Sequence, residues 1–152
     1  MQAVRKIWAA LSRRSTMADK VVTYEELVSL LETRSIRLFD VRSPQEVAQG
    51  AISTSAVNIP VSELEAALSL PATDFLLKYG VAKPQASDSD VVFHCGVGVR
   101  SQRALDTATK LGYHGVRHFP GGYNEWKSKQ SQIQSDHIAR IPRPKEFHTE
   151  CT

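Results

Sequence analysis

Cysteine is scarce in this chain: Cys95 and Cys151 are the two cysteines among 152 residues. A single pair excludes the disulfide framework of a small secreted domain. The chain also lacks the paired Cys and His spacing of a zinc site. Cys151 stands one residue from the end and is interpreted as a solvated thiol. Cys95 is therefore the cysteine that needs an explanation.

Long apolar runs are also missing. No stretch approaches the ~18 apolar residues that a membrane-spanning helix needs, so we expect no membrane segment. With 41% hydrophobic and 23% charged residues, the composition is that of an ordinary soluble globular protein. The length leaves room for one domain of common size.

Acidic residues are absent from residues 1–18, which contain four Arg or Lys. Because the net charge of the whole chain is +3, the remainder carries −1 and has no basic excess for binding nucleic acid. The start is amphipathic, basic and acid-poor, which is typical of a leader that directs a protein to the mitochondrial matrix. A disordered basic tail is the alternative, and initiation at Met17 would give a cytoplasmic form.

Beyond residue 18, short apolar runs alternate with helical patterns. The apolar runs predict five strands, at residues 21–22, 36–39, 56–59, 91–94 and 116–119. Helices are predicted at residues 23–33, 44–50, 62–70, 73–79 and 100–111, and after the pair Gly121-Gly122. This alternation indicates an α/β domain with a central, mostly parallel five-stranded sheet and helices on both faces. We place the domain at residues 19–130 and a polar tail at residues 131–152.

Capping residues mark where three of the helices begin. Thr23 is placed to cap the first helix. Ser43 and Glu46 form a capping box, with a proline at the first helical position between them. Ser62 and Glu65 form a second capping box, which predicts a helix start at that point.

Cys95 lies between a buried strand and a helix, in the loop Cys95-Gly96-Val97-Gly98-Val99-Arg100-Ser101. Exposed N–H groups of the loop and the positive end of the following helix favour a thiolate over a thiol. The two glycines allow the positive φ angles that a tight loop requires. Arg100 adds a positive charge at the rim. The loop is therefore suited to bind an anion and to attack it.

Several polar residues near this loop also have structural interpretations. Asp40 ends a strand, and it either orients the active loop or caps the turn to Arg42. Arg42 and Glu46 are interpreted as an ion pair. His94 precedes the nucleophile on its strand, where alternation turns the side chain away from it. His94 is therefore interpreted as a packed residue rather than a base.

With these segments identified, the chain resembles the rhodanese-type sulfurtransferases, and among them the small single-domain thiosulfate sulfurtransferases. The matching segments cover about residues 20–130 in order: Leu38-Phe39-Asp40-Val41-Arg42-Ser43 with Glu46, Gly50-Ala51-Ile52, Val57 to Leu64, the C-x-x-G-x-R-S loop from Cys95 to Ser101, Leu111-Gly112-Tyr113, and Gly121-Gly122-Tyr123-Asn124-Glu125-Trp126. The run from 91 to 101 and the run from 57 to 64 favour the branch that passes sulfur from thiosulfate to glutathione.

The resemblance implies a two-step cycle that needs no metal and no organic cofactor. Cys95 attacks the outer sulfur of thiosulfate, stores it as a persulfide, and passes it to an acceptor thiol such as glutathione, or to cyanide. The implied catalytic residues are Cys95 and Arg100. The implied substrate-binding residues are Gly96, Val97, Gly98, Val99, Ser101, Asp40 and Arg42. We expect a monomer whose partners are a small-molecule sulfur donor and a thiol acceptor.

The rim of the loop departs from relatives that carry Lys or Arg there, because this chain has Val97 and Val99. Loss of positive charge weakens the attraction for a small dianion. The sequence therefore predicts a modest affinity for thiosulfate.

Two other functions stay open. A His-Cys-loop-Arg signature also serves phosphate-ester cleavage, but those families place five residues between Cys and Arg where this chain has four. A rhodanese fold can also act as a non-catalytic or sulfur-delivery module, although inactive members typically lack the cysteine. The donor also stays open among thiosulfate, glutathione persulfide and 3-mercaptopyruvate.

Overall fold

The computed structural model describes residues 17–141, and their side chains from Asp19 onward. Residues 1–16 of the predicted leader lie outside the described residues. Residues 142–152, which include Cys151 and half of the predicted tail, also lie outside them.

The sheet has four parallel strands, β1 (Arg37–Asp40), β2 (Val57–Asn58), β3 (Val91–His94) and β4 (Arg117–Phe119). Their order is β2-β1-β3-β4, so β1 and β3 are central. Asp40 is level with Asn58 of β2 and His94 of β3, and the carboxyl ends of these strands therefore meet at one edge. The predicted parallel α/β architecture is confirmed, with one strand fewer than expected.

The missing fifth strand is the run at residues 21–22, which forms an isolated bridge. Val21 pairs in parallel with His118, and the N–H of Val22 donates to the His118 carbonyl at 2.8 Å. The short 3-10 helix η1 (Met17–Lys20) ends directly before this run, and α2 (Tyr24–Glu32) begins almost directly after it. Too few extended residues remain between the two helices to form a strand.

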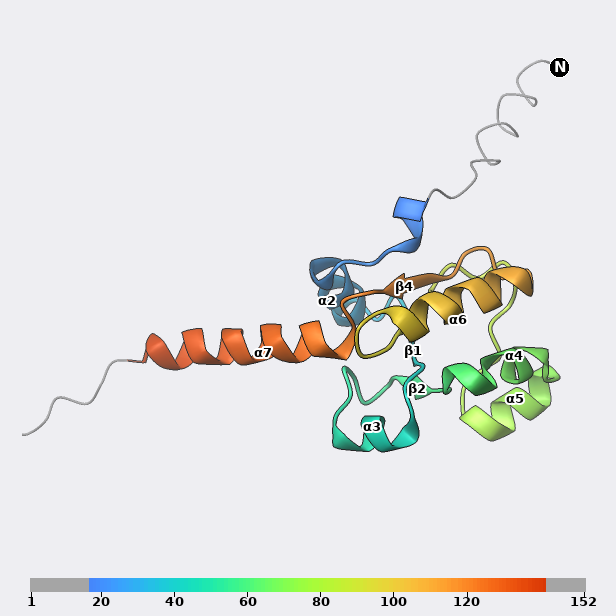
Figure 1. Cartoon of the computed structure of the whole chain (residues 1–152), viewed down its shortest axis with the longest axis horizontal. Helices are drawn as coiled ribbons and strands as arrows, with labels where there is room; N and C mark the ends of the chain where they lie inside the picture. Colours follow the sequence, from blue (N-terminus) through green and yellow to red (C-terminus); the bar gives the residue numbers. More distant parts are fainter. Residues whose placement is uncertain (1–16, 142–152) are drawn as a thin grey trace, which may run out of the picture.

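Helices cover both faces of the sheet (Figure 1). After α2 they are α3 (Pro44–Gln49), α4 (Val61–Ser69), α5 (Ala72–Tyr79), α6 (Val99–Lys110) and α7 (Gly122–Ala139). Apolar side chains of α4, α5 and α6 pack on one face with Phe39 and Phe93. Apolar side chains of α2 and the start of α7 pack on the other face with Leu38 and Val92. Neighbouring residues of β1 and β3 thus enter opposite clusters, as the two-residue period of a strand requires.

Two of the three predicted helix starts are confirmed. Thr23 and Ser43 each close a capping box, with Glu26 and Glu46 respectively. The capping box predicted at Ser62 is wrong, because α4 begins one residue earlier and its start has no side-chain cap. The N–H of Val61 donates instead to the Val41 carbonyl at 3.1 Å. A backbone contact with the end of β1 therefore fixes this helix start.

The last helix is longer than expected. α7 continues past Ser131, where the polar tail was predicted to begin, and ends at Ala139, shortly before Pro142. Residues 131–141 are all exposed, and Figure 1 shows this half of α7 running out from the body of the domain. The division of the chain at residues 18 and 130 stays a prediction.

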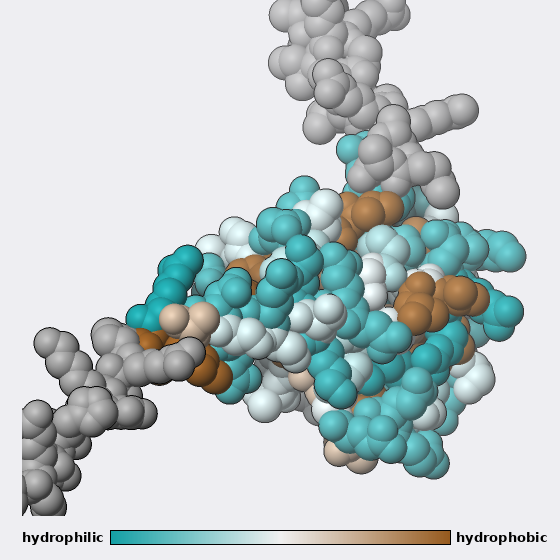
Figure 2. Space-filling model, turned by 60° about the vertical axis from the view of Figure 1, so that its left-hand side comes forward, coloured by the Kyte–Doolittle hydropathy of each residue, from teal (hydrophilic) through white to brown (hydrophobic). Residues whose placement is uncertain are grey.

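Apolar side chains on the surface are scattered. Figure 2 shows separate hydrophobic patches on a mostly hydrophilic face. Isolated exposed apolar residues are normal for a folded domain, and here they include Leu77 on α5 and Ile138 on α7. Within residues 17–141, no helix combines the length and the apolar character that crossing a membrane requires.

Candidate active site

Cys95 follows directly on β3, at the edge where the strands end, and α6 begins four residues later. Gly98 turns the chain into α6 with φ at +96°, in the left-handed region. A Cβ at this position would lie 2.6 Å from the Pro120 carbonyl oxygen. The loop therefore needs glycine here for two reasons, the backbone angle and the close approach of the chain after β4.

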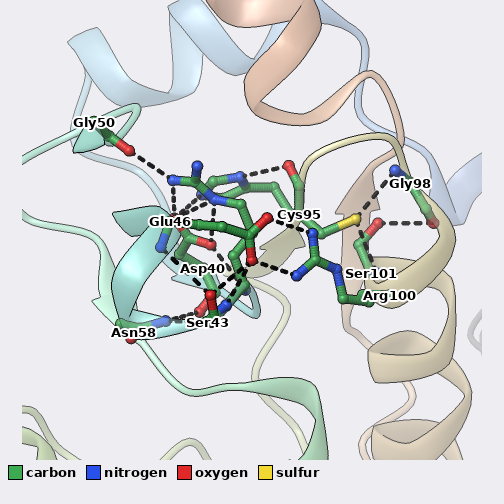
Figure 3. Close-up of polar contacts among 11 residues, drawn as sticks. Asp40, Ser43, Glu46, Gly50, Asn58, Cys95, Gly98, Arg100 and Ser101 are labelled. Carbon is green, nitrogen blue, oxygen red and sulfur yellow. Dashed lines mark hydrogen bonds and ion pairs between the residues drawn. The ribbon is translucent and has the colours of Figure 1, made fainter. Parts of the chain in front are cut away.

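Backbone N–H donors lie around the Cys95 sulfur (Figure 3). The N–H of Gly98 donates to Sγ at 3.1 Å, and the N–H of Ser101 donates to it at 3.4 Å. The predicted convergence of loop N–H groups on the sulfur is thus present at Gly98 and Ser101.

These donors set the protonation state of Cys95. The residue is 1% exposed, and burial on its own raises the pKa of the thiol. The hydrogen bonds from Ser101, Gly98 and Val97 together outweigh burial and hold the pKa below its ordinary value. A thiolate is therefore favoured at the base of the loop, which is the state that a nucleophile needs.

The start of α7 fixes the same loop from its carbonyl side. The N–H of Tyr123 donates to the Cys95 carbonyl at 2.7 Å, and the N–H of Asn124 donates to the Gly96 carbonyl at 3.2 Å. Gly122 has φ at +64°, and a Cβ there would lie within 2.5 Å of both carbonyl oxygens. A helix was predicted after the pair Gly121-Gly122, and Gly122 also permits this close approach to the cysteine loop.

Glu46 pairs with Arg100 rather than with Arg42. The Arg100 guanidinium donates from Nη1 to Oε2 at 2.7 Å and from Nη2 to Oε1 at 2.9 Å. The hydrogen bond from Arg100, followed by those from Ser43, lowers the pKa of Glu46 to about 2. The predicted Arg42–Glu46 ion pair is wrong, because Arg42 precedes α3 and the two residues do not share a helix face. Arg100 stands at the rim as expected, with two of its five N–H donors engaged.

Asp40 and Arg42 form a buried ion pair beneath the loop. Arg42 Nη2 donates to Asp40 Oδ2 at 2.7 Å and to the Gly50 carbonyl at 2.8 Å. The Arg42 N–H donates to Asp40 Oδ1 at 3.0 Å, so Asp40 caps the turn. The guanidinium also lies over the Tyr123 ring, 4.3 Å from its centroid. This geometry gives Asp40 and Arg42 a supporting place, and their contact with substrate stays a prediction.

His94 is fully buried behind the nucleophile. Its Nε2 lies 3.5 Å from Asp40 Oδ2, and its Nδ1 lies 3.4 Å from the Cys95 carbonyl oxygen. Burial lowers the pKa of His94, and the nearby Asp40 carboxylate opposes this only in part. The imidazole is therefore neutral and packed, as the strand alternation indicated.

The outer rim of the loop is apolar. Val97 and Val99 are 66% and 60% exposed. They border an open depression of about 620 Å³ that Val21, Pro120 and Arg103 also line. The surface on this side of the loop is therefore apolar, and the Arg100–Glu46 pair lies at the rim.

Sequence reasoning missed one polar contact behind the loop. Ser101 Oγ lies 3.0 Å from Nδ1 of His118, a buried residue of β4. The two residues are 17 positions apart, and only the packing of α6 against β4 brings them together. In the described part of the chain, no group of three or more His, Cys, Asp or Glu is placed to hold a metal ion.

Comparison with known proteins gives a consistent set of relatives. A family model described as a rhodanese-like domain matches residues 23–129. The human thiosulfate:glutathione sulfurtransferase is 46% identical over 110 residues, which cover 72% of this chain and 95% of that protein. Mouse thiosulfate sulfurtransferase/rhodanese-like domain-containing protein 3 is 41% identical over 123 residues, which cover 81% of this chain and 77% of that protein.

Further similarity comes from a solved structure and a yeast protein. The structure of the human single-domain sulfurtransferase TSTD1 superimposes with a TM-score of 0.69 at 44% identity, covering 72% of this chain and 96% of that chain. The mitochondrial thiosulfate sulfurtransferase RDL2 of Saccharomyces cerevisiae is 35% identical over 117 residues, which cover 76% of this chain and 77% of that protein.

Proposed function

The chain belongs to the rhodanese-like domain family, and from this premise we propose that it is a sulfurtransferase that moves the outer sulfur of thiosulfate to an acceptor thiol such as glutathione. Cys95 carries the sulfur between the two substrates. The observation that carries the proposal is the set of N–H donors around the Cys95 sulfur, since they favour the thiolate on which both steps depend.

The first step forms a bond between Cys95 Sγ and the outer sulfur of thiosulfate. The S–S bond of thiosulfate breaks, its electron pair leaves with sulfite, and Cys95 becomes a persulfide. In the second step an acceptor thiolate attacks the outer sulfur of the persulfide. The acceptor becomes a persulfide, or thiocyanate when cyanide is the acceptor, and the Cys95 thiolate is restored. We propose that the protein acts as a monomer, because one copy of the chain supplies both the nucleophile and the donors around it.

The cysteine loop stabilises the negative charges of the substrate and of the reacting sulfur. Its N–H groups stabilise negative charge on sulfur in both steps. Arg100 keeps N–H donors beyond the two that bind Glu46, and these hold the sulfonate end of thiosulfate at the rim. Asp40 and Arg42 keep the ends of β1 and β3 in place beneath the loop.

The persulfide step is tested by intact mass measurement after treatment with thiosulfate. We expect a gain of about 32 Da, one sulfur atom, as covalent catalysis requires. Cys151→Ser should gain the same mass, and Cys95→Ser should gain none. A Cys95→Ser protein that keeps full sulfurtransferase activity would contradict the proposal. Turnover of p-nitrophenyl phosphate without any sulfur transfer would favour the phosphatase alternative.

We further propose that the protein works in the mitochondrial matrix. The acid-poor, basic and amphipathic residues 1–18 support this location, as does the mitochondrial name of the yeast relative. A fusion of residues 1–18 to a fluorescent protein should enter mitochondria. A fusion in which the four basic residues are replaced by Gln should stay outside. Equal distribution of the two fusions would contradict the proposed location.

A further inference from the structure

His118 is a buried polar residue that the proposed cycle does not use. It lies on β4, opposite Phe93 of β3, and is 4% exposed. Its backbone carbonyl accepts from Val22, and its Nδ1 points at the Ser101 hydroxyl at 3.0 Å. A buried imidazole that contacts a side chain of the cysteine loop can influence the nucleophile without touching it.

Ser101 is the link between His118 and the sulfur. Its hydroxyl donates to the Gly98 carbonyl at 3.1 Å and lies 3.0 Å from His118 Nδ1. Its backbone N–H donates to the Cys95 sulfur at 3.4 Å, so the single hydroxyl proton has the sulfur as a further acceptor beside it. The hydrogen bond from the Ser101 side chain is among those that lower the pKa of Cys95. The support that Ser101 gives to the thiolate therefore depends on where its single proton points.

The proton on His118 decides between these arrangements. Burial lowers the pKa of His118, and Asp106 of α6 opposes this only in part, so the imidazole is neutral and carries one N–H. If Nε2 carries the proton, Nδ1 accepts from Ser101 and draws its proton away from the sulfur. If Nδ1 carries it, His118 donates to Ser101 Oγ, and the serine proton is free for the anionic sulfur. A thiolate binds that proton more strongly than the neutral Gly98 carbonyl does.

We propose that His118 is a positioning residue: its Nδ1–H donates to Ser101 Oγ and directs the serine proton onto the Cys95 sulfur. A side-chain donor is thereby added to the backbone donors of the loop. The proposal rests on the proposed role of Cys95 as the nucleophile. It goes beyond that role by assigning a residue of β4 to the control of thiolate formation.

The first test needs no variant. Long-range ¹⁵N–¹H correlation spectra of the wild-type protein at pH 7.5 distinguish the two neutral tautomers of a histidine. We expect His118 to carry its proton on Nδ1. A signal pattern with the proton on Nε2 would overturn the proposal, because Nδ1 would then accept from Ser101.

The second test measures the pKa of Cys95 from the pH dependence of its alkylation by iodoacetamide. A Cys151→Ser background leaves Cys95 as the single thiol. His118→Phe keeps a ring but removes the donor, and we expect it to raise the apparent pKa of Cys95 by about 0.5. His118→Asn places an amide N–H near the position of Nδ1 and should restore the wild-type value. The exposed His114 offers a control, and His114→Phe should leave the pKa unchanged.

A double-variant comparison with Ser101 distinguishes the positioning role of His118 from an effect of its packing. Ser101→Ala should raise the pKa of Cys95, and adding His118→Phe to it should raise the pKa no further. Equal effects of His118→Phe with and without the serine hydroxyl would overturn the proposal. Sulfur loading by mass is measured separately on each protein. A wild-type protein that loads sulfur while His118→Phe leaves the pKa unchanged would refute the positioning role alone.

Discussion

Two arginines near Cys95 differ in how much of their hydrogen-bonding capacity is already used. Arg42 is 3% exposed and is engaged by Asp40, the Gly50 carbonyl and the Tyr123 ring. Arg100 is partly exposed and binds one carboxylate through two of its N–H groups. Arg100 is therefore the arginine that can also bind an incoming anion. Removing Arg42 would leave the Asp40 carboxylate buried without its main partner. We therefore expect the loss of Arg42 to lower the stability of the fold before it affects substrate binding.

Sequence spacing gave a wrong partner for Glu46 because the true partner is remote. Arg42 and Glu46 are four positions apart, which brings side chains together only when both lie on one helix. Arg100 is 54 positions from Glu46, and only the fold brings the start of α6 beside α3. The contact between Ser101 and His118 was missed for the same reason.

The exposed valines of the loop rim lead to a prediction about thiosulfate. The wild-type Michaelis constant for thiosulfate should lie above the low-micromolar range. Val97→Lys should raise kcat/KM for thiosulfate about fivefold at low ionic strength, because a positive charge near Sγ attracts the dianion. The gain should fall as salt is added. Steady-state kinetics at two salt concentrations measure both effects.

Leu77 offers a matched control for this change. It is 85% exposed on α5, outside the loop, so Leu77→Lys adds the same charge to the surface away from the rim. Its kcat/KM should equal that of the wild type. A Val97→Lys protein with unchanged kcat/KM, or one whose gain persists at high salt, would contradict an electrostatic role for the rim.

At the scale of secondary-structure elements, local chemistry predicted two of the three capped helix starts and the place of Cys95 between a strand and a helix. Thr23 and Ser43 act within their own first helical turn, so the sequence contains all the information. The start of α4 depends on a bond between Val61 and the end of β1, which no local pattern reveals. The run at 21–22 has strand-forming residues, but flanking helices leave it too short to pair as a strand.

The turn from β3 into α6 leads to a prediction about glycine. Gly98 and Gly112 have the same φ of +96°, but a Cβ would meet the Pro120 carbonyl at Gly98 and nothing within 4 Å at Gly112. Gly98→Ala should therefore displace the loop donors, lowering kcat/KM at least about tenfold and raising the pKa of Cys95. Thiosulfate kinetics and the alkylation profile measure the two effects.

Gly112→Ala isolates the cost of the backbone angle. It should lower stability by about 1 kcal/mol, as expected for a left-handed non-glycine residue, and leave kcat/KM unchanged. Similar losses of kcat/KM in both variants would mean that the strained angle, rather than contact with Pro120, controls the loop.

At the scale of the whole molecule, the parallel α/β sheet and the loop at its edge could be predicted because each depends on alternating local patterns. The Arg100–Glu46 pair could not, and it joins α6 to α3 across the mouth of the site. Glu46 also closes the capping box of α3 through Ser43. One carboxylate thus stabilises a helix start and a tertiary contact together, so its protonation affects the folding of the whole domain.

The depressed pKa of Glu46 predicts how stability changes in acid. Its pKa is lowered from 4.5 to about 2 in the folded protein, so the folded state binds fewer protons than the unfolded state between these values. The stabilisation is present above about pH 4.5 and is lost as the pH falls toward 2. Because the side chain is 42% exposed, we expect about 1 kcal/mol rather than a larger buried-pair value. Glu46→Gln should lower the free energy of unfolding in urea at pH 7 by about this amount, and the difference from wild type should shrink steadily below pH 4.5.

Glu26 provides a control that separates the contribution of the Arg100 ion pair from that of the capping box. It occupies the same position in the capping box of α2, and none of the ion pairs found among residues 17–141 includes it. Glu26→Gln should therefore remove a cap of the same kind without breaking a contact between distant elements. At pH 7, Glu26→Gln should lower the free energy of unfolding in urea by less than Glu46→Gln does. If the two variants lose equal stability and follow the same pH course, the link between α3 and α6 contributes nothing, and the acid sensitivity of Glu46 belongs to the cap alone.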